Sequence, residues 1–308
     1  MAEVTAKLVK ELRELTGSGM MDCKKALVAV EGDIDKAADW LRENGILKAQ
    51  KKSGRIAAEG LVRTDFNDDH TEASIVEVNS ETDFVAKNEE FVEFVERLAK
   101  QALDKAQGTL DDFLEGDLDG KTVKEVLTDK VAKIGENLNI RRYEKMGEDG
   151  VKYIGYTHGG GRIGVVVGLK TDADWKDVEQ VGKDVAMQVA SMAPKFVSAA
   201  DVAQDWLENE RKILKEAVIN EGKKPEMADK IVDGKIKKEL KEVCLTEQAF
   251  VKDSDKSVQQ YVDEAAKALG KDIEIVSMTR YEVGEGIEKK EEDFAAEVAA
   301  QQAAAAQK

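Results

Sequence analysis

Glycine-containing segments give this sequence its most obvious candidates for chemistry. Residues 159–164 match the dinucleotide fingerprint, in which glycines let backbone N–H groups at a helix start hold a pyrophosphate. Three valines, 165–167, follow directly, and a run of β-branched residues indicates a strand rather than a helix. We therefore interpret these glycines as a tight hairpin turn and not as a nucleotide site.

Two further segments lack a residue that their chemistry requires. His158 and the three glycines after it resemble the oxyanion hole of esterases, but the sequence holds no G-x-S-x-G nucleophile. Residues 120–122 resemble the end of a P-loop, but Glu115 stands where that motif needs its first glycine. Thr122 and Glu125 instead predict a capping box at the start of a helix. No catalytic set is supported.

Metal and disulfide chemistry is excluded by the residue counts. The chain has two cysteines, Cys23 and Cys244, and two histidines, His70 and His158. Without a C-x-x-C spacing these residues cannot form a zinc ribbon, a disulfide framework or a His-rich metal site. Both cysteines are expected to be buried structural thiols, and no cofactor is expected.

One short loop holds residues suited to binding another protein. Residues 81–85 lie between an expected strand and an expected helix, and they place Phe84 and Val85 beside Asp83. The two apolar side chains can staple the helix that follows, or they can form an exposed anchor next to a carboxylate. The sequence leaves both interpretations open.

The charge balance limits the partners and the compartment. A net charge of −16 argues against direct binding of nucleic acid by phosphate neutralisation over the whole surface. Residues 1–55 hold 11 basic and 9 acidic residues, so the rest of the chain carries −18, which marks a small separate domain. No secretory signal opens the chain, and no apolar run approaches the roughly 18 residues of a membrane span. We expect a cytoplasmic protein with no membrane partner.

Residues 1–55 are expected to form an N-terminal three-helix domain. Apolar residues recur at helical spacing in three runs that are separated by glycines. Residues 48–55, with four basic residues and a Ser-Gly pair, are predicted to be a linker. Met20 and Met21 fall between the first two runs, where they are either core residues, the commoner case, or an adaptable contact surface.

The remaining chain predicts an α+β fold built from a duplicated unit. In the first core subdomain, residues 56–150, alternating β-rich segments predict a hairpin, then a helix from Asn88 and a closing strand near residue 140. The second core subdomain, residues 151–193 and 243–283, repeats hairpin, helix and strand in the same order.

An inserted segment, residues 194–242, separates the two parts of the second subdomain. Two apolar stripes with a Glu-Gly-Lys-Lys turn between them predict an antiparallel helical hairpin, and Pro225 suits the first position of its second helix. The hairpin either makes a dimer contact or folds back on its own domain. Residues 284–308 predict a C-terminal helix carrying Phe294, with an Ala/Gln-rich end.

Taken together, these segments resemble the elongation factor Ts family, the bacterial guanine-nucleotide exchange factors of elongation factor Tu. The resemblance covers nearly the whole chain and is carried by residues 15–27, 78–86, 133–137, 158–167 and 280–287. It implies a ubiquitin-associated-like N-terminal domain, two core subdomains, a dimerising helical hairpin and a C-terminal helical module.

The resemblance also implies which residues contact the partner. The family's loop that enters the GTPase near its magnesium and phosphate site corresponds to Thr82, Asp83, Phe84 and Val85. A turn that touches the nucleotide domain corresponds to Met20 and Met21. The remaining contacts implied by the family are Ile134, Gly135, His158 and Phe294.

The function implied is promotion of GDP release from elongation factor Tu during translation elongation, without making or breaking a bond. The chain is therefore not expected to be an enzyme. The alternative is a non-catalytic scaffold that binds proteins through its three-helix domain and helical hairpin. A homodimer through residues 194–242 is possible in either case.

Overall fold

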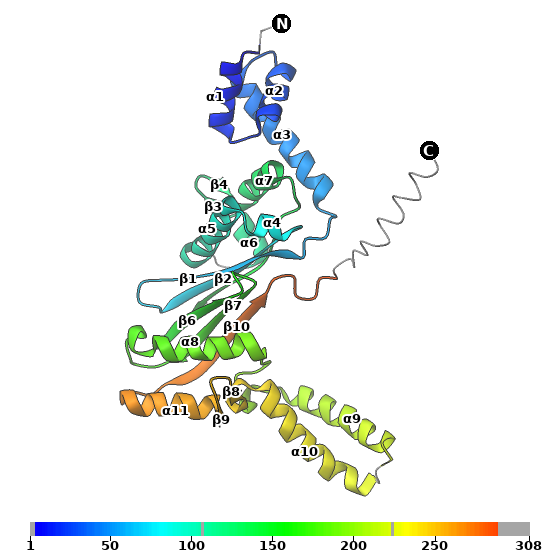
Figure 1. Ribbon diagram of the computed structural model, residues 1–308, viewed down its shortest axis with the longest axis vertical. Coiled ribbons are helices and arrows are strands. Elements are labelled where there is room, and N and C mark those ends of the chain that lie inside the picture. The colour runs from blue at the N-terminus through cyan, green and yellow to red at the C-terminus, as the bar shows by residue number, and fades with distance from the viewer. Residues whose placement is uncertain (1–3, 106–107, 223–224, 289–308) are drawn as a thin grey trace.

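The computed structural model of the chain describes residues 4–105, 108–222 and 225–288. It combines helices with small antiparallel sheets, which confirms the α+β prediction. Figure 1 shows an elongated molecule with the N-terminal helices at one end, the sheets and their covering helices in the middle, and a projecting helical hairpin at the other end.

The three predicted N-terminal helices are present as α1 (Ala6–Thr16), α2 (Met20–Ala29) and α3 (Ile34–Lys52). Their shared core includes the fully buried Leu12, Cys23 and Leu27. The predicted linker begins later than expected, because α3 continues to Lys52. Two lysines in its last turn are favourable there, since cations stabilise the C-terminal end of a helix dipole.

The first sheet has the order β1-β2-β5, with all neighbours antiparallel. Its strands are β1 (Glu59–Phe66), β2 (Glu72–Ser80) and β5 (Asn139–Gly147). The amphipathic helix α5 (Glu89–Lys105) buries Phe91, Phe94 and Leu98 against this sheet. The predicted hairpin, helix and strand are confirmed.

Short elements connect α5 to β5: α6 (Leu110–Leu114), β3 (Asp117–Leu118), β4 (Lys121–Thr122) and α7 (Val123–Ile134). Thr122 caps α7, and its hydroxyl accepts the Glu125 N–H at 3.1 Å while Glu125 accepts the Thr122 N–H at 3.0 Å. This is the predicted capping box. The Gly-Lys-Thr segment thus starts a helix and does not cradle a phosphate.

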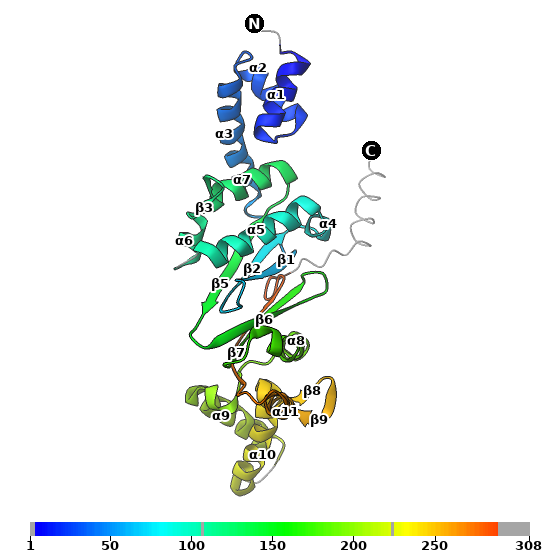
Figure 2. The same ribbon diagram turned by 90° about the vertical axis from the view of Figure 1, so that its left-hand side faces the viewer.

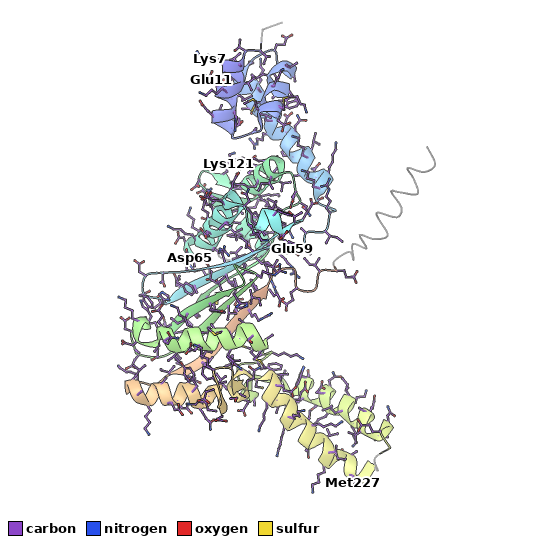
Figure 3. All side chains as sticks on the ribbon, viewed as in Figure 1. Lys7, Glu11, Glu59, Asp65, Lys121 and Met227 are labelled. Carbon is purple, nitrogen blue, oxygen red and sulfur yellow. The ribbon has the colours of Figure 1, made fainter. Side chains whose placement is uncertain are left out.

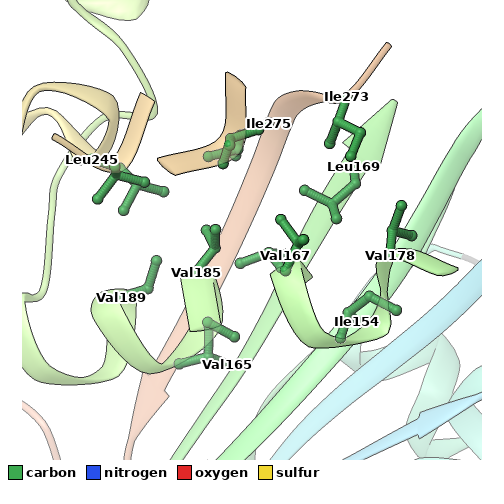
Figure 4. Packing of buried hydrophobic residues seen from close by; sticks show 14 of the residues in the cluster. Ile154, Val165, Val167, Leu169, Val178, Val185, Val189, Leu245, Ile273 and Ile275 are labelled. Carbon is green, nitrogen blue, oxygen red and sulfur yellow. The ribbon is translucent and has the colours of Figure 1, made fainter. Parts of the chain in front are cut away.

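The second sheet repeats the plan, with the order β6-β7-β10. Its strands are β6 (Val151–His158), β7 (Ile163–Lys170) and β10 (Glu274–Glu282), and in both sheets the second hairpin strand is central. Figure 4 shows how α8 (Trp175–Met192) presents Val185 and Val189 to the valines of β7. The remaining elements of this part are η1 (Ala199–Asp201), η2 (Leu245–Glu247), β8 (Ala249–Phe250), β9 (Asp253–Ser257) and α11 (Val258–Leu269).

The two sheets meet at β1 and the turn between β6 and β7. The Val62 N–H donates to the Gly161 carbonyl at 2.7 Å, and Val62 packs with Val166 in a third core cluster. At the other end of β1, the His70 ring stacks on Trp175 with ring centroids 3.9 Å apart. These contacts hold the two halves as one body.

The inserted segment forms the predicted helical hairpin, α9 (Gln204–Asn220) and α10 (Pro225–Val243). Its two helices bury Val218, Val232 and Ile236 between them. Figure 1 shows the hairpin projecting away from the sheets, so it does not fold back on its own domain. Met227 lies at its outer end (Figure 3).

The part of the chain that the structure describes holds no cluster of metal ligands and no helix that could span a membrane. No group of three or more potential ligands gathers among these residues. None of the described helices is long and apolar enough to span a bilayer. Cys23 and Cys244 are both buried, as predicted, and burial raises the pKa of each thiol.

Candidate protein-binding site

The loop that holds Phe84 contains a helical turn that was not predicted, α4 (Asp83–Ala86). Thr82 caps the turn, and its hydroxyl accepts the Val85 N–H at 3.4 Å. Val85 and Ala86 face inward and pack against the first core, whereas Phe84 is 82% exposed. Among the described residues, no other large apolar side chain is as exposed. Phe84 therefore does not staple the next helix, and it is available as an anchor.

Asp83 lies beside this exposed ring and is held by an ion pair. Lys87 Nζ donates to Asp83 Oδ2 at 2.6 Å, one helical turn away. The hydrogen bond from Lys87 lowers the pKa of the Asp83 carboxyl, which favours its ionised form. The tip of the loop thus offers a phenyl ring next to a carboxylate whose charge is balanced within the chain.

A carboxylate from a distant segment holds the loop from behind. Glu136 Oε2 accepts the backbone N–H groups of Glu81 at 3.1 Å and of Thr82 at 3.0 Å. Glu136 Oε1 accepts the Thr82 hydroxyl at 2.7 Å. Ile134 and Gly135 immediately precede this carboxylate, so they lie next to the Phe84 turn, where the resemblance placed them at the same interface.

Gly135 ends α7 in the left-handed conformation, with a φ of 88°. A residue with a β-carbon is strained in this conformation, so glycine is the suitable residue at the point where the chain leaves the helix. Ile134 is half-buried against the first core. The segment therefore presents a fixed backbone turn rather than a large side chain.

His158 is the last residue of β6 and lies at the same end of the sheets as the Phe84 turn. Arg162, in the turn after β6, forms an ion pair of 2.8 Å with Glu59, and Glu59 pairs in register with Ser80 at the end of β2. Figure 2 shows α4 and this turn on the same side of the molecule. His158 is exposed, and its Nδ1 lies 3.0 Å from the Tyr156 hydroxyl.

Met20 and Met21 are separate from this cluster, on the N-terminal helices. Their exposed fractions are 58% and 64%, so the interpretation of them as core residues is wrong. They start α2, and the residues that this helix buries in the core are Cys23, Ala26 and Leu27. A cleft of about 810 Å³ separates the turn before them from α7. Phe294 lies outside the described residues.

Glu136 was missed as a functional candidate from the sequence, and Glu81, although it lies in the loop singled out there, was given no role. The segment containing Glu136 was noticed through the family resemblance, but no periodicity or motif connects it to Thr82, 54 residues earlier. The one available signal was a carboxylate directly after a helix-ending glycine. An exposed ring on a held turn is an arrangement suited to binding a protein partner.

Comparisons with known proteins agree on one family. A family model described as Elongation factor TS matches residues 81–285. A protein named Elongation factor Ts from Clostridioides difficile strain 630 is 54% identical over 302 residues, which cover 98% of this chain and 99% of the relative. Proteins of the same name from Clostridium perfringens strain SM101 and Clostridium botulinum strain Alaska E43 are 52% and 48% identical. The first match covers 96% of this chain and 98% of the relative, and the second covers 97% and 99%.

Proposed function

Since this chain belongs to the elongation factor Ts family, we propose that it is the guanine-nucleotide exchange factor that releases GDP from elongation factor Tu. It acts in translation elongation by binding and not as an enzyme. We place it in the cytoplasm, where translation occurs, with no nucleic acid or membrane as a direct partner. The finer divisions proposed are the ubiquitin-associated-like domain 1–55, the core subdomains, the hairpin 194–242 and the C-terminal module.

The observation that carries this proposal is Phe84, an apolar ring that is 82% exposed on a turn held from behind. A large exposed ring on a fixed backbone is a strong anchor for a protein partner, because little side-chain or loop entropy is lost on binding. We propose that Phe84 enters the partner near its magnesium and phosphate site, with Thr82, Asp83 and Val85 in the same contact.

The proposed mechanism is a free-energy coupling between two ligands of the GTPase. If the factor binds nucleotide-free elongation factor Tu more tightly than Tu·GDP, GDP binding must weaken by the same factor. Phe84 supplies the coupling by placing its ring between elements that must close around the nucleotide. Asp83 disturbs the charge balance around the magnesium ion. GTP then binds and expels the factor.

The other proposed contacts extend this surface. Ile134, Gly135 and His158 share the end of the sheets with Phe84, as the hydrogen bonds of Glu136 and the Arg162–Glu59 pair indicate. Met20 and Met21 form a second exposed apolar patch on the N-terminal helices. The Phe84 surface and the Met20–Met21 patch are separate, so we propose that elongation factor Tu contacts this protein at both.

A direct test separates this function from the scaffold alternative. Elongation factor Tu is loaded with fluorescent GDP, and release is followed after excess unlabelled GDP is added, with and without this protein. An exchange factor accelerates release at substoichiometric concentrations. A scaffold forms a complex but leaves the release rate unchanged, and that result would reject the exchange function.

We further propose that the helical hairpin forms a homodimer. Three of its large apolar side chains, Ile213, Ile219 and Met227, are between 41% and 59% exposed. Such residues on a projecting hairpin are stabilised when a second copy covers them.

Removing the outer hairpin, residues 208–239, is expected to give a monomer by light scattering. A short glycine-rich turn can replace it, because Leu207 and Leu240 pack in the same cluster at the hairpin base. Val243 also accepts hydrogen bonds from Lys195 and Phe196, so the base stays closed. A particle mass that is twice the chain mass in both proteins would show that the dimer does not form through the hairpin. A mass equal to one chain in the unmodified protein would contradict the dimer itself.

A further inference from the structure

The Glu136 carboxylate joins two segments of the proposed partner surface. Both of its oxygens are used by one target, the chain just before α4, through the N–H groups of Glu81 and Thr82 and the Thr82 hydroxyl. We propose that Glu136 is a positioning residue that sets the Phe84 turn against the Ile134–Gly135 segment. The proposal rests on the proposed exchange function and adds to it a residue that does not itself touch the partner.

The turn that carries Phe84 is too short to hold its own orientation. It has four helical residues, and so short a helix gains few internal hydrogen bonds in return for the residues it orders. Its direction is therefore set by what holds its N-terminal end. Thr82 is both the capping residue of α4 and the residue that makes two hydrogen bonds to Glu136.

The segment that contains Glu136 is held in turn by a carboxylate of the loop. Glu81 Oε1 accepts the Asn137 N–H at 2.6 Å, so each segment supplies a carboxylate to the backbone of the other. Arg55 contacts both segments, because Arg55 Nη1 lies 3.4 Å from Glu81 and the Arg55 carbonyl accepts a hydrogen bond from Asn137 Nδ2 at 2.7 Å.

This arrangement fixes three pieces of chain in one geometry before any partner arrives. These are the Phe84 turn, the Ile134–Gly135 segment and the chain that leads down from α3 through Arg55. Preorganised contact residues bind more tightly because the entropy of ordering them has already been lost during folding. A misplaced contact weakens the step that it drives, even when the contact residue itself is unchanged.

The test compares Glu136→Ala with Glu136→Gln and a matched control, Glu115→Ala. Glu115 is another carboxylate at a helix end, and among the described residues it forms one ion pair, a surface contact with Lys124 at 3.3 Å. We expect Glu136→Ala to slow stimulated release of fluorescent GDP by about 10- to 100-fold. Glu136→Gln keeps an acceptor oxygen for the two N–H groups and should recover most of the rate. Glu115→Ala should match the unmodified protein.

Hydrogen exchange of the isolated protein provides a readout that does not require the partner. In Glu136→Ala, the Glu81 and Thr82 amides should lose protection by about tenfold or more, while central β2 and β5 amides keep theirs. If the unmodified protein fails to accelerate GDP release, the exchange function fails, yet the amides still test the positioning role. Unchanged protection of these amides, or an equal loss throughout β2 and β5, would overturn the proposal. So would full stimulation by Glu136→Ala.

Discussion

Replacing Phe84 with alanine is expected to lower the stimulated rate of GDP release from elongation factor Tu by about 30-fold or more. Anchors of this kind contribute at least about 2 kcal/mol to an interface, and each 1.4 kcal/mol of coupling corresponds to a factor of about ten. Folding should change little, because the ring is 82% exposed and buries almost nothing in the free protein. Such surface substitutions usually alter stability by less than about 0.5 kcal/mol.

The measurement is stopped-flow release of fluorescent GDP over a range of factor concentrations, together with thermal unfolding of each variant. Val251→Ala is a suitable control, since Val251 is also an exposed apolar residue, at 43%, but lies between β8 and β9 in the distant second half. Phe84→Leu should retain part of the activity, because it keeps apolar bulk at the same position. Unreduced exchange by Phe84→Ala would remove the ring from the mechanism.

Local patterns predicted the elements of this fold well. The apolar stripe of α5, the β-rich runs of β1 and β2 and the Thr122–Glu125 box are all signals within a few residues of each other, and the helix, the hairpin and the capping box were confirmed. The glycines at 159–161 were also interpreted correctly as a turn, since all three have positive φ and join two antiparallel strands.

What the sequence could not predict depends on contacts between distant segments. Met20 and Met21 are of a residue type common in cores, and only the packing of α2 leaves their side chains exposed. Glu136 and Thr82 meet across 54 residues. Phe84 and Val85 are neighbours in sequence, yet one is exposed and the other half-buried, because a single helical turn places them on different faces.

Glu77 is the most consequential of these long-range contacts for stability. It lies in the middle of β2 with no exposed surface, among apolar neighbours that gave no sign of its role. Its carboxylate accepts hydrogen bonds from Arg141 at 3.1 Å, Arg142 at 2.6 Å and the Gly284 N–H at 2.9 Å. A register shift in the β2–β5 pairing skips Arg141, and such a bulge redirects the side chain.

The same carboxylate fixes where the chain leaves β10. Gly284 has a φ of 71°, and a β-carbon at this position would overlap the Ala58 carbonyl oxygen, so glycine is required there. Its N–H donates to Glu77, which ties the second residue after the last strand to the first sheet. Glu77 therefore holds together β2, β5 and the beginning of the C-terminal segment.

Replacing Glu77 with glutamine is expected to destabilise the first sheet by about 3 kcal/mol. The shape is preserved, so the loss arises from two partly buried arginines that no longer face an anion. Hydrogen exchange of the β2 and β5 amides measures the change locally, which avoids assuming that the whole chain unfolds in one step. Glu72→Gln is the matched control on the same strand, because its ion pair with Lys145 is at the surface and should contribute less than about 1 kcal/mol.

The effect of Glu77→Gln should depend on pH in a defined direction. Burial acts to raise the pKa of the Glu77 carboxyl, but the Gly284 N–H, Arg142 and Asn79 outweigh it and hold that pKa below its ordinary value. As the pH falls, the unfolded chain therefore takes up the proton first. The stabilisation is complete above the unfolded pKa of about 4.3 and is lost as the pH falls through the folded value. The difference between the two proteins should thus be constant near neutrality and shrink below about pH 4. A difference that stays constant into acid would show that the carboxylate charge is not what stabilises the sheet.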